Sequence, residues 1–227
     1  MKKIAAPYIM PVTSPLIKNG IIYTDDDGTI KKMEARKDIK EEAGVAYYNG
    51  VIIPGFVNAY GSLQAGTLLA ASKAESYAEY LLKRQSAASY PLEAETLQAW
   101  QHYMWQKGVQ AIGNGCYRGI KEGKSKIRYH QFLEIFDRSL EELPEELEHA
   151  QDVFHASSIT PYAGFTAGTK MWNMLLERAR AQKAPLALNN QRSVAEDEMY
   201  RQKTGQLFRR LRKGGYNLKT FAPTGKS

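Results

Sequence analysis

Polar side chains follow several apolar runs of this sequence, at points where buried strands are expected to end. The first of these runs, Val51–Val57, passes through a Pro-Gly corner and leads to Tyr60, Ser62 and Gln64. This pattern is typical of a strand that delivers side chains to the mouth of an α/β fold. Further polar residues lie at the ends of later predicted strands: Asn114, Tyr162, Asn189, Gln191 and Arg192. Together they could bind an anionic or purine-like small molecule, although none is an obvious base for activating water.

The elements that would position these residues alternate between strands and helices. Strands are predicted over residues 109–116, 127–136, 156–163 and 184–192, and helices over 74–86, 92–107, 139–154 and 167–182. Ser193 and Glu196 have the spacing of a capping box, which predicts a further helix continuing to Gly214. The alternation favours a parallel, right-handed α/β architecture.

The first 53 residues have the pattern of a small β-domain instead. Asn19-Gly20, Asp27-Gly28 and Asn49-Gly50 are hairpin signals between short apolar runs. The acidic residues before Gly28 are interpreted as part of a turn, because the glutamate spacing of a calcium loop is missing. We therefore expect two domains, residues 1–53 and 54–227.

Composition excludes several classes of protein. The chain of 227 residues has 43% hydrophobic and 24% charged residues, which is ordinary for a globular protein. No apolar run approaches the length needed to cross a membrane. A single cysteine, Cys116, excludes an internal disulfide framework. We expect this thiol to be buried and inert, and the protein to be cytoplasmic.

The positive net charge of +7 belongs to the end of the sequence. Eight of the 31 basic residues follow Glu198, and no acidic residue does. We interpret them as a solvated basic helix end, which the helix dipole favours. We do not expect nucleic acid as a partner, since no stacking platform or recognised motif accompanies the charges.

The segment Pro54–Ala59 resembles, residue for residue, the first barrel strand of the metal-dependent amidohydrolase superfamily. The likeness is closest to its deaminase and chlorohydrolase branch, including the aminofutalosine deaminases. It implies a TIM-type (β/α) barrel preceded by a small β-domain. It also implies a Zn²⁺ or Fe²⁺ ion whose bound water attacks a C–N or C–Cl carbon, as in the deamination of aminopurine-like or aminofutalosine-like substrates.

The resemblance assigns a role to each polar position. Tyr60, Ser62 and Asn189 stand where the family has metal-binding histidines, whereas Gln64 and Arg192 stand where it has glutamates, the second an acid-base residue. Asn114 replaces an aspartate of the second strand, Tyr162 replaces a substrate-side histidine, and Gln191 belongs to the fifth-strand motif.

These replacements predict that the family chemistry is lost. Asparagine is a poor zinc ligand, and the fixed charge of Arg192 would repel a cation. The four histidines lie on different units and predict no substitute site. We therefore expect no bound metal or other cofactor and no catalysis; the alternative is a metal-free hydrolase or deaminase, or a small-molecule binding protein.

The length after Ile53 accommodates only about five of the eight units of a barrel. The expected fold is thus an incomplete, truncated barrel. Its open edge would be covered by a second copy of the chain or by an intact homologue. A fragment of a gene without function is a further possibility.

Overall fold

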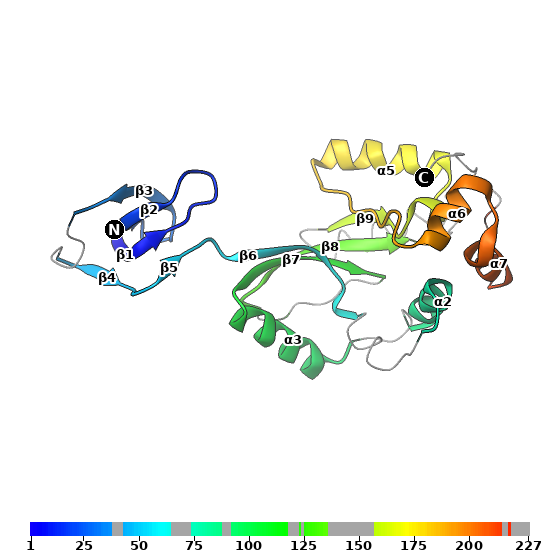
Figure 1. Cartoon of the computed structure of the whole chain (residues 1–227), viewed down its shortest axis with the longest axis horizontal. Helices are drawn as coiled ribbons and strands as arrows, with labels where there is room; N and C mark the ends of the chain where they lie inside the picture. Colours follow the sequence, from blue (N-terminus) through cyan, green and yellow to red (C-terminus); the bar gives the residue numbers. More distant parts are fainter. Residues whose placement is uncertain are drawn as a thin grey trace. The chain divides into compact units, whose positions relative to one another are not determined.

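The computed structural model describes residues 1–37, 43–64, 74–87, 92–117, 123, 125–135, 157–214 and 218. The chain divides into two compact units, Met1–Phe56 and Val57–Ser227 (Figure 1). The predicted helix over residues 139–154 lies outside the described residues, as do His149 and His155. Among the helices that are described, none is both long and apolar enough to span a membrane.

The first unit is a β-sheet built around its first strand. Its strands are β1 (Lys2–Ile9), β2 (Ile17–Thr24), β3 (Ile30–Ala35), β4 (Val45–Tyr47) and β5 (Val51–Ile52). β1 pairs antiparallel with β2 on one side and parallel with β4 and β5 on the other. Ala5, Ile21 and Tyr23 form the buried centre of this sheet, against which Val45 packs.

One of the three predicted hairpins is confirmed. The turn between β2 and β3 closes with a 3.1 Å hydrogen bond from Gly28 N to Asp25 O, and Gly28 has a φ of +90°. The other two predictions were wrong. Asn19-Gly20 lies inside β2, where a Cβ atom on Gly20 would lie 2.4 Å from the Ile9 side chain. Asn49-Gly50 links β4 to β5, and both of these strands pair with β1, so this link is not a hairpin turn.

The second unit contains a four-stranded sheet in the order β6-β7-β8-β9. Its strands are β6 (Phe56–Gly61), β7 (Val109–Cys116), β8 (Arg128–Ile135) and β9 (Ser157–Pro161). β7 runs parallel to β8, and β8 runs parallel to β9. Its named helices are α2 (Tyr77–Ala87), α3 (Ala94–Gln106), α5 (Thr169–Gln182), α6 (Val194–Gln202) and α7 (Gly205–Lys213), with a short 3-10 helix, η1 (Gly164–Thr166). The predicted α/β architecture with a parallel sheet is confirmed.

Helices cover one face of this sheet. On that face Ile112 is paired with Tyr129, and Cys116 with Leu133. The first pair packs with Leu97 of α3, and the second packs with residues of α5. Trp105 of α3 also packs against this core, whereas Trp100 of the same helix is 37% exposed.

The predicted strand over residues 184–192 was wrong. This segment makes a single parallel bridge, between Ala163 and Asn189. Pro185 has no backbone N–H to donate, and Gln191 has a φ of +51°, which a strand does not accommodate. The carbonyl of Ala187 accepts a hydrogen bond from the side chain of Thr160 instead of from a strand backbone.

The predicted helix after Ser193 is broken in two. Ser193 caps α6 as expected, its Oγ accepting a 3.2 Å hydrogen bond from Glu196 N. α6 then ends at Lys203, which has a φ of +55°, and α7 begins at Gly205, with a φ of +89°. These left-handed residues stop the helical repeat and turn the chain, so that Leu207 and Leu211 reach the same core as Met199.

Candidate functional site at the carboxyl ends of the strands

A hydrogen-bonded network links residues from three separate parts of the second unit. Tyr60 at the end of β6 donates its hydroxyl hydrogen to Oε1 of Glu134 near the end of β8. Asn189 Nδ2 lies 3.1 Å from the Tyr60 hydroxyl oxygen and 2.8 Å from the carbonyl oxygen of Tyr162. The structure therefore brings together Tyr60 and Asn189, two of the three positions predicted to correspond to metal ligands.

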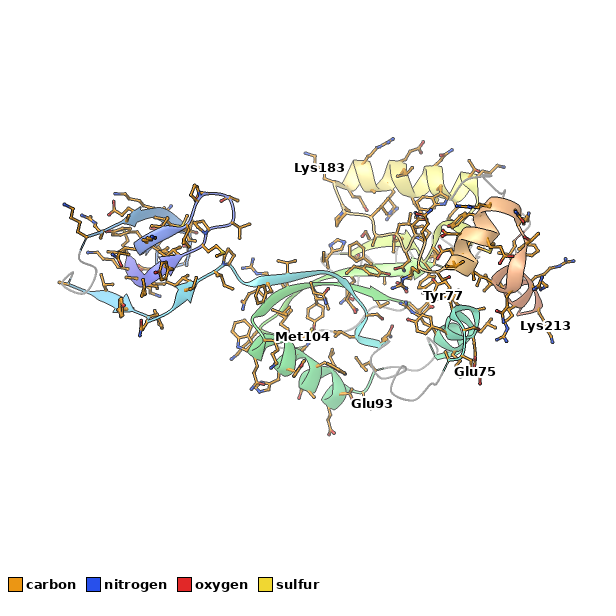
Figure 2. The ribbon with its side chains drawn as sticks, viewed as in Figure 1. Glu75, Tyr77, Glu93, Met104, Lys183 and Lys213 are labelled. Carbon is orange, nitrogen blue, oxygen red and sulfur yellow. The ribbon has the colours of Figure 1, made fainter. Side chains whose placement is uncertain are left out.

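An arginine from α2 completes this network. A terminal nitrogen of Arg84 lies 2.5 Å from Oε2 of Glu134, and the two side chains are 4% and 0% exposed. The guanidinium carbon also lies 4.7 Å from the ring centroid of Tyr162 and 5.6 Å from that of Tyr117. Figure 2 shows the side chains of this unit, with Tyr77 at the first turn of α2. We call Tyr60, Arg84, Glu134 and Asn189 the mouth network.

The charges of the mouth network balance. Burial raises the pKa of the Glu134 carboxyl, and the Arg84 guanidinium and Tyr60 hydroxyl oppose this rise. Burial lowers the pKa of Arg84, but the charge of Glu134 and the nearby tyrosines outweigh it, so that this pKa lies above its ordinary value. Arginine remains charged in proteins, so an ionised Glu134 avoids leaving a lone buried cation. We assign the pair as guanidinium and carboxylate.

The Tyr60 hydroxyl keeps its hydrogen. Burial raises the pKa of this phenol well above its ordinary value, and the negative charge of Glu134 raises it further. At neutral pH the hydroxyl is therefore a donor to Glu134, and its oxygen accepts the hydrogen of Asn189 Nδ2.

Glycines of β7 leave room for these side chains. A Cβ atom on Gly115 would lie 2.6 Å from Glu134 Oε1 and 2.8 Å from the Tyr60 hydroxyl oxygen. A Cβ atom on Gly113 would lie 2.3 Å from the Ala59 carbonyl oxygen. The close approach of β6 and of the network to β7 thus requires glycine at both positions.

Tyr162, predicted to lie on the substrate side, is fully buried between two arginines. Its ring faces Arg84, and its hydroxyl accepts a 3.0 Å hydrogen bond from Nη1 of Arg192. Arg192 is itself exposed. Gln191 is also exposed, and its backbone N–H donates to Oε1 of Glu196 at 3.2 Å.

Asn114 and Gln64, two other predicted site residues, bond to groups that are not members of the mouth network. Asn114 is on the helix-covered face, where its Oδ1 accepts from Leu63 N at 3.1 Å and its Nδ2 donates to Gln131 at 2.9 Å. Gln64 Oε1 accepts from Tyr117 N at 3.5 Å. Ser62 directly follows β6 and is half-buried. Asn114 is thus bound to structural partners on the opposite face from Tyr60.

Two residues of the mouth network, Arg84 and Glu134, were missed by the sequence reasoning. Glu134 could have been recognised from the sequence, because it is the one charged residue in the apolar run Phe132–Phe136. Arg84 has no comparable feature in the sequence around it. Its role depends on where α2 lies, which the pattern of α2 itself does not encode.

The residues at the mouth do not fit a zinc or iron ion. The carbonyl of Tyr162 can only accept, so the Asn189 atom facing it is the amide nitrogen, which is not a ligand. Tyr60 is protonated, and Arg84 adds a positive charge. In the part of the chain that the structure describes, no group of three or more His, Cys, Asp or Glu side chains could hold a metal.

The described histidines and the cysteine serve other contacts. His130 Nε2 lies 2.8 Å from Ser158 Oγ, and burial lowers the pKa of this histidine. His102 lies on the exposed side of α3. Cys116 is fully buried, as predicted, with its Sγ 3.4 Å from Gln131 Oε1.

No protein-family model matches this chain, and no curated relative matches it in sequence. Solved structures do match it. Aminofutalosine deaminase from Helicobacter pylori, in complex with methylthio-coformycin, has a TM-score of 0.80 at 16% identity over 99% of this chain. Atrazine chlorohydrolase from Arthrobacter aurescens, complexed with zinc, has a TM-score of 0.68 at 12% identity over 95%.

A third match is an adenosine deaminase from Xanthomonas campestris with bound zinc, with a TM-score of 0.61 at 15% identity over 94% of this chain. The chain spans 58%, 58% and 54% of the length of these three structures, respectively. The resemblance inferred from Pro54–Ala59 is confirmed as a likeness of fold: the chain has the fold of the corresponding part of deaminases and chlorohydrolases of the amidohydrolase superfamily.

Proposed function

We propose that this protein is a non-catalytic member of the amidohydrolase superfamily, in which metal-dependent hydrolysis of C–N bonds has been lost. One observation carries the proposal. Asn189 and Tyr60 stand where the resemblance places metal ligands, and they hydrogen-bond to each other at 3.1 Å. The Asn189 amide nitrogen and the Tyr60 hydroxyl are thus used within the protein.

The remaining groups supply no substitute for a metal-bound water. Glu134 is a carboxylate at the mouth, but both of its oxygens accept hydrogen bonds, from Tyr60 and Arg84. Arg192 stands at the predicted acid-base position and cannot accept a proton at neutral pH. A metal-free hydrolase or deaminase, the alternative considered from the sequence, would therefore lack a free base at this site.

The proposed architecture is a partial TIM-type barrel over residues 54–227, after a β-domain over residues 1–53. The parallel pairs of β7, β8 and β9 and the matching deaminase folds support it. We further propose a cytoplasmic protein that associates with a second copy or with an intact homologue. Among the strands that the structure describes, β6 lies at an edge of its sheet, and Val57 on it is 67% exposed.

Metal content and turnover test the proposed function. The purified chain is incubated with Zn²⁺ or Fe²⁺, passed over a desalting column and measured for metal by mass spectrometry. The same samples are assayed for ammonia release from aminofutalosine, adenosine and guanine, with the Helicobacter pylori deaminase as the positive control. We expect less than 0.1 metal ion per chain and no ammonia above the blank.

Two results would contradict the proposal. One metal ion per chain together with metal-dependent turnover would show that the family chemistry is retained. Turnover that persists in a chelator would instead favour the metal-free enzyme. Sedimentation of the same sample tests association, for which a monomer at all concentrations is the contrary result.

A further inference from the structure

We infer that Arg84 is an internal cation that replaces a bound metal as the positive charge organising the mouth of this fold. This inference rests on the proposed function, in that the mouth holds no metal ion. The positive charge at the mouth is instead supplied by the Arg84 side chain of helix α2. The mouth is then closed by a side chain and is not an empty version of an active site.

The geometry around Arg84 is that of a bound cation. One terminal nitrogen contacts Glu134 at 2.5 Å, and two aromatic rings, those of Tyr162 and Tyr117, lie within 5.6 Å of the guanidinium carbon. A carboxylate and the faces of aromatic rings are the groups that stabilise a desolvated guanidinium. Glu134 accepts a hydrogen bond from Tyr60, whose oxygen accepts one from Asn189, so that contacts from Arg84 extend to two of the three predicted ligand positions.

The charge pair lies beside a hydrophobic core. Leu81 and Ala78 of α2 are buried with Tyr162, Leu207 and Leu211, and α2 also packs against α7. A charge left alone at such a place has no access to bulk water to compensate it. Removing one partner of the pair is therefore expected to be much more costly than removing both.

The same surroundings define what would bind if the Arg84 side chain were absent. Arg84→Ala vacates a space bounded by a buried carboxylate and two tyrosine rings. A planar cation of the guanidinium class fits such a space, because it can bond to the carboxylate and stack on aromatic faces. Tetramethylammonium carries the same charge and can contact aromatic faces, but it has no N–H group to donate to the carboxylate.

Thermal unfolding of the full-length chain tests this inference. We expect Arg84→Ala to lower the Tm by roughly 10 °C. Addition of about 10 mM methylguanidinium chloride should recover at least a third of that loss, whereas tetramethylammonium chloride should recover none. Arg180→Ala on the exposed side of α5 is the matched control, for which neither the substitution nor the salts should shift the Tm by more than about 2 °C.

A second pair of variants keeps the test decisive if Arg84→Ala does not fold. Arg84→Met alone should be strongly destabilised, and addition of Glu134→Gln to it should restore at least half of the lost Tm. Additive losses in the double variant, or equal effects of the two salts, would overturn the inference. Metal binding and turnover by the unsubstituted chain would contradict the proposed function. The Tm values of the single and double variants measure the coupling between Arg84 and Glu134, whatever the result of the metal assay.

Discussion

Nδ2 of Asn189 lies 3.1 Å from the hydroxyl oxygen of Tyr60, although 129 positions separate the two residues. Tyr60 lies on β6, at one edge of the four-stranded sheet, and Asn189 is bridged to Ala163 just after β9, the strand at the other edge. Neighbouring strands are about 4.8 Å apart, so in a flat sheet these edges would be roughly 15 Å apart. The sheet is therefore strongly curved, as in the wall of a barrel.

Tyr60→Phe should destabilise the second unit. The substitution removes one oxygen atom and with it the hydrogen bonds to Glu134 Oε1 and Asn189 Nδ2. Glu134 Oε2 keeps Arg84 and Asn189 Nδ2 keeps the Tyr162 carbonyl, but Oε1 loses the donor that satisfies it. An unsatisfied buried polar group costs about 1–3 kcal/mol, so we expect a loss of about 2 kcal/mol in the free energy of unfolding. Urea denaturation followed by circular dichroism measures this change.

Tyr48→Phe is the matched control for that experiment, because Tyr48 is 60% exposed in the first unit. Its substitution should change the free energy of unfolding by less than about 0.5 kcal/mol. A Tyr60→Phe variant as stable as the unsubstituted protein would mean that the hydroxyl contributes nothing to the mouth network.

Gly115→Ala should disturb the mouth network without removing any of its members. The added Cβ would lie within 3 Å of both Glu134 Oε1 and the Tyr60 hydroxyl oxygen, so one of these side chains must move. Overpacking of this kind costs about 1–3 kcal/mol, measurable by the same denaturation. Gly50→Ala is the control, because a Cβ there meets nothing within 4 Å. Equal stabilities of the two variants would refute the close packing of β7 against the network.

The strands and helices that the sequence predicted well are those with a clear local pattern. The strand predicted over 109–116 has the same bounds as β7, and α5 ends at Gln182 as expected. The segment 184–192 was misassigned as a strand, because apolar residues alone do not form strand pairing when Pro185 and the left-handed Gln191 interrupt it. The continuous helix after Ser193 was misassigned for a similar reason, since no residue type marks the left-handed conformation of Lys203.

The site was predictable only where a known family offered positions to compare. Tyr60 and Asn189 were placed together on that basis, and the structure brings them into contact. Asn114 was expected to join them, but its place in the alternation of β7 directs it to the other face of the sheet. The partner of Glu134 comes from α2, and such a long-range pairing cannot be obtained from periodicity in a single element.

Lys183→Gly should stabilise the protein. Lys183 follows the last turn of α5 with a φ of +50°, a left-handed conformation that glycine adopts without steric cost. We expect a gain of about 0.5–1 kcal/mol in the free energy of unfolding. Glu177→Gly, in the exposed middle of the same helix, should have the opposite sign and lose about 1 kcal/mol. A destabilised Lys183→Gly variant would show that the lysine side chain makes a compensating contact at this cap.

Acid should weaken the first unit through Glu34 on β3. Hydrogen bonds from Lys32 and then Tyr23, with the charge of Arg36, lower the pKa of this carboxyl to about 2 from its ordinary value of 4.5. Because the folded pKa is the lower one, the contribution of Glu34 to stability is complete above about pH 4.5 and is lost as pH falls towards 2. Titration of the glutamate carboxyl carbons by NMR measures this pKa directly.

In Glu34→Gln the fall in stability between pH 4.5 and 2 should be smaller than in Glu177→Gln, the control variant, which removes one exposed carboxylate from α5. An equal fall in the two variants, or a Glu34 pKa near 4.5, would contradict the hydrogen bonding of this carboxylate.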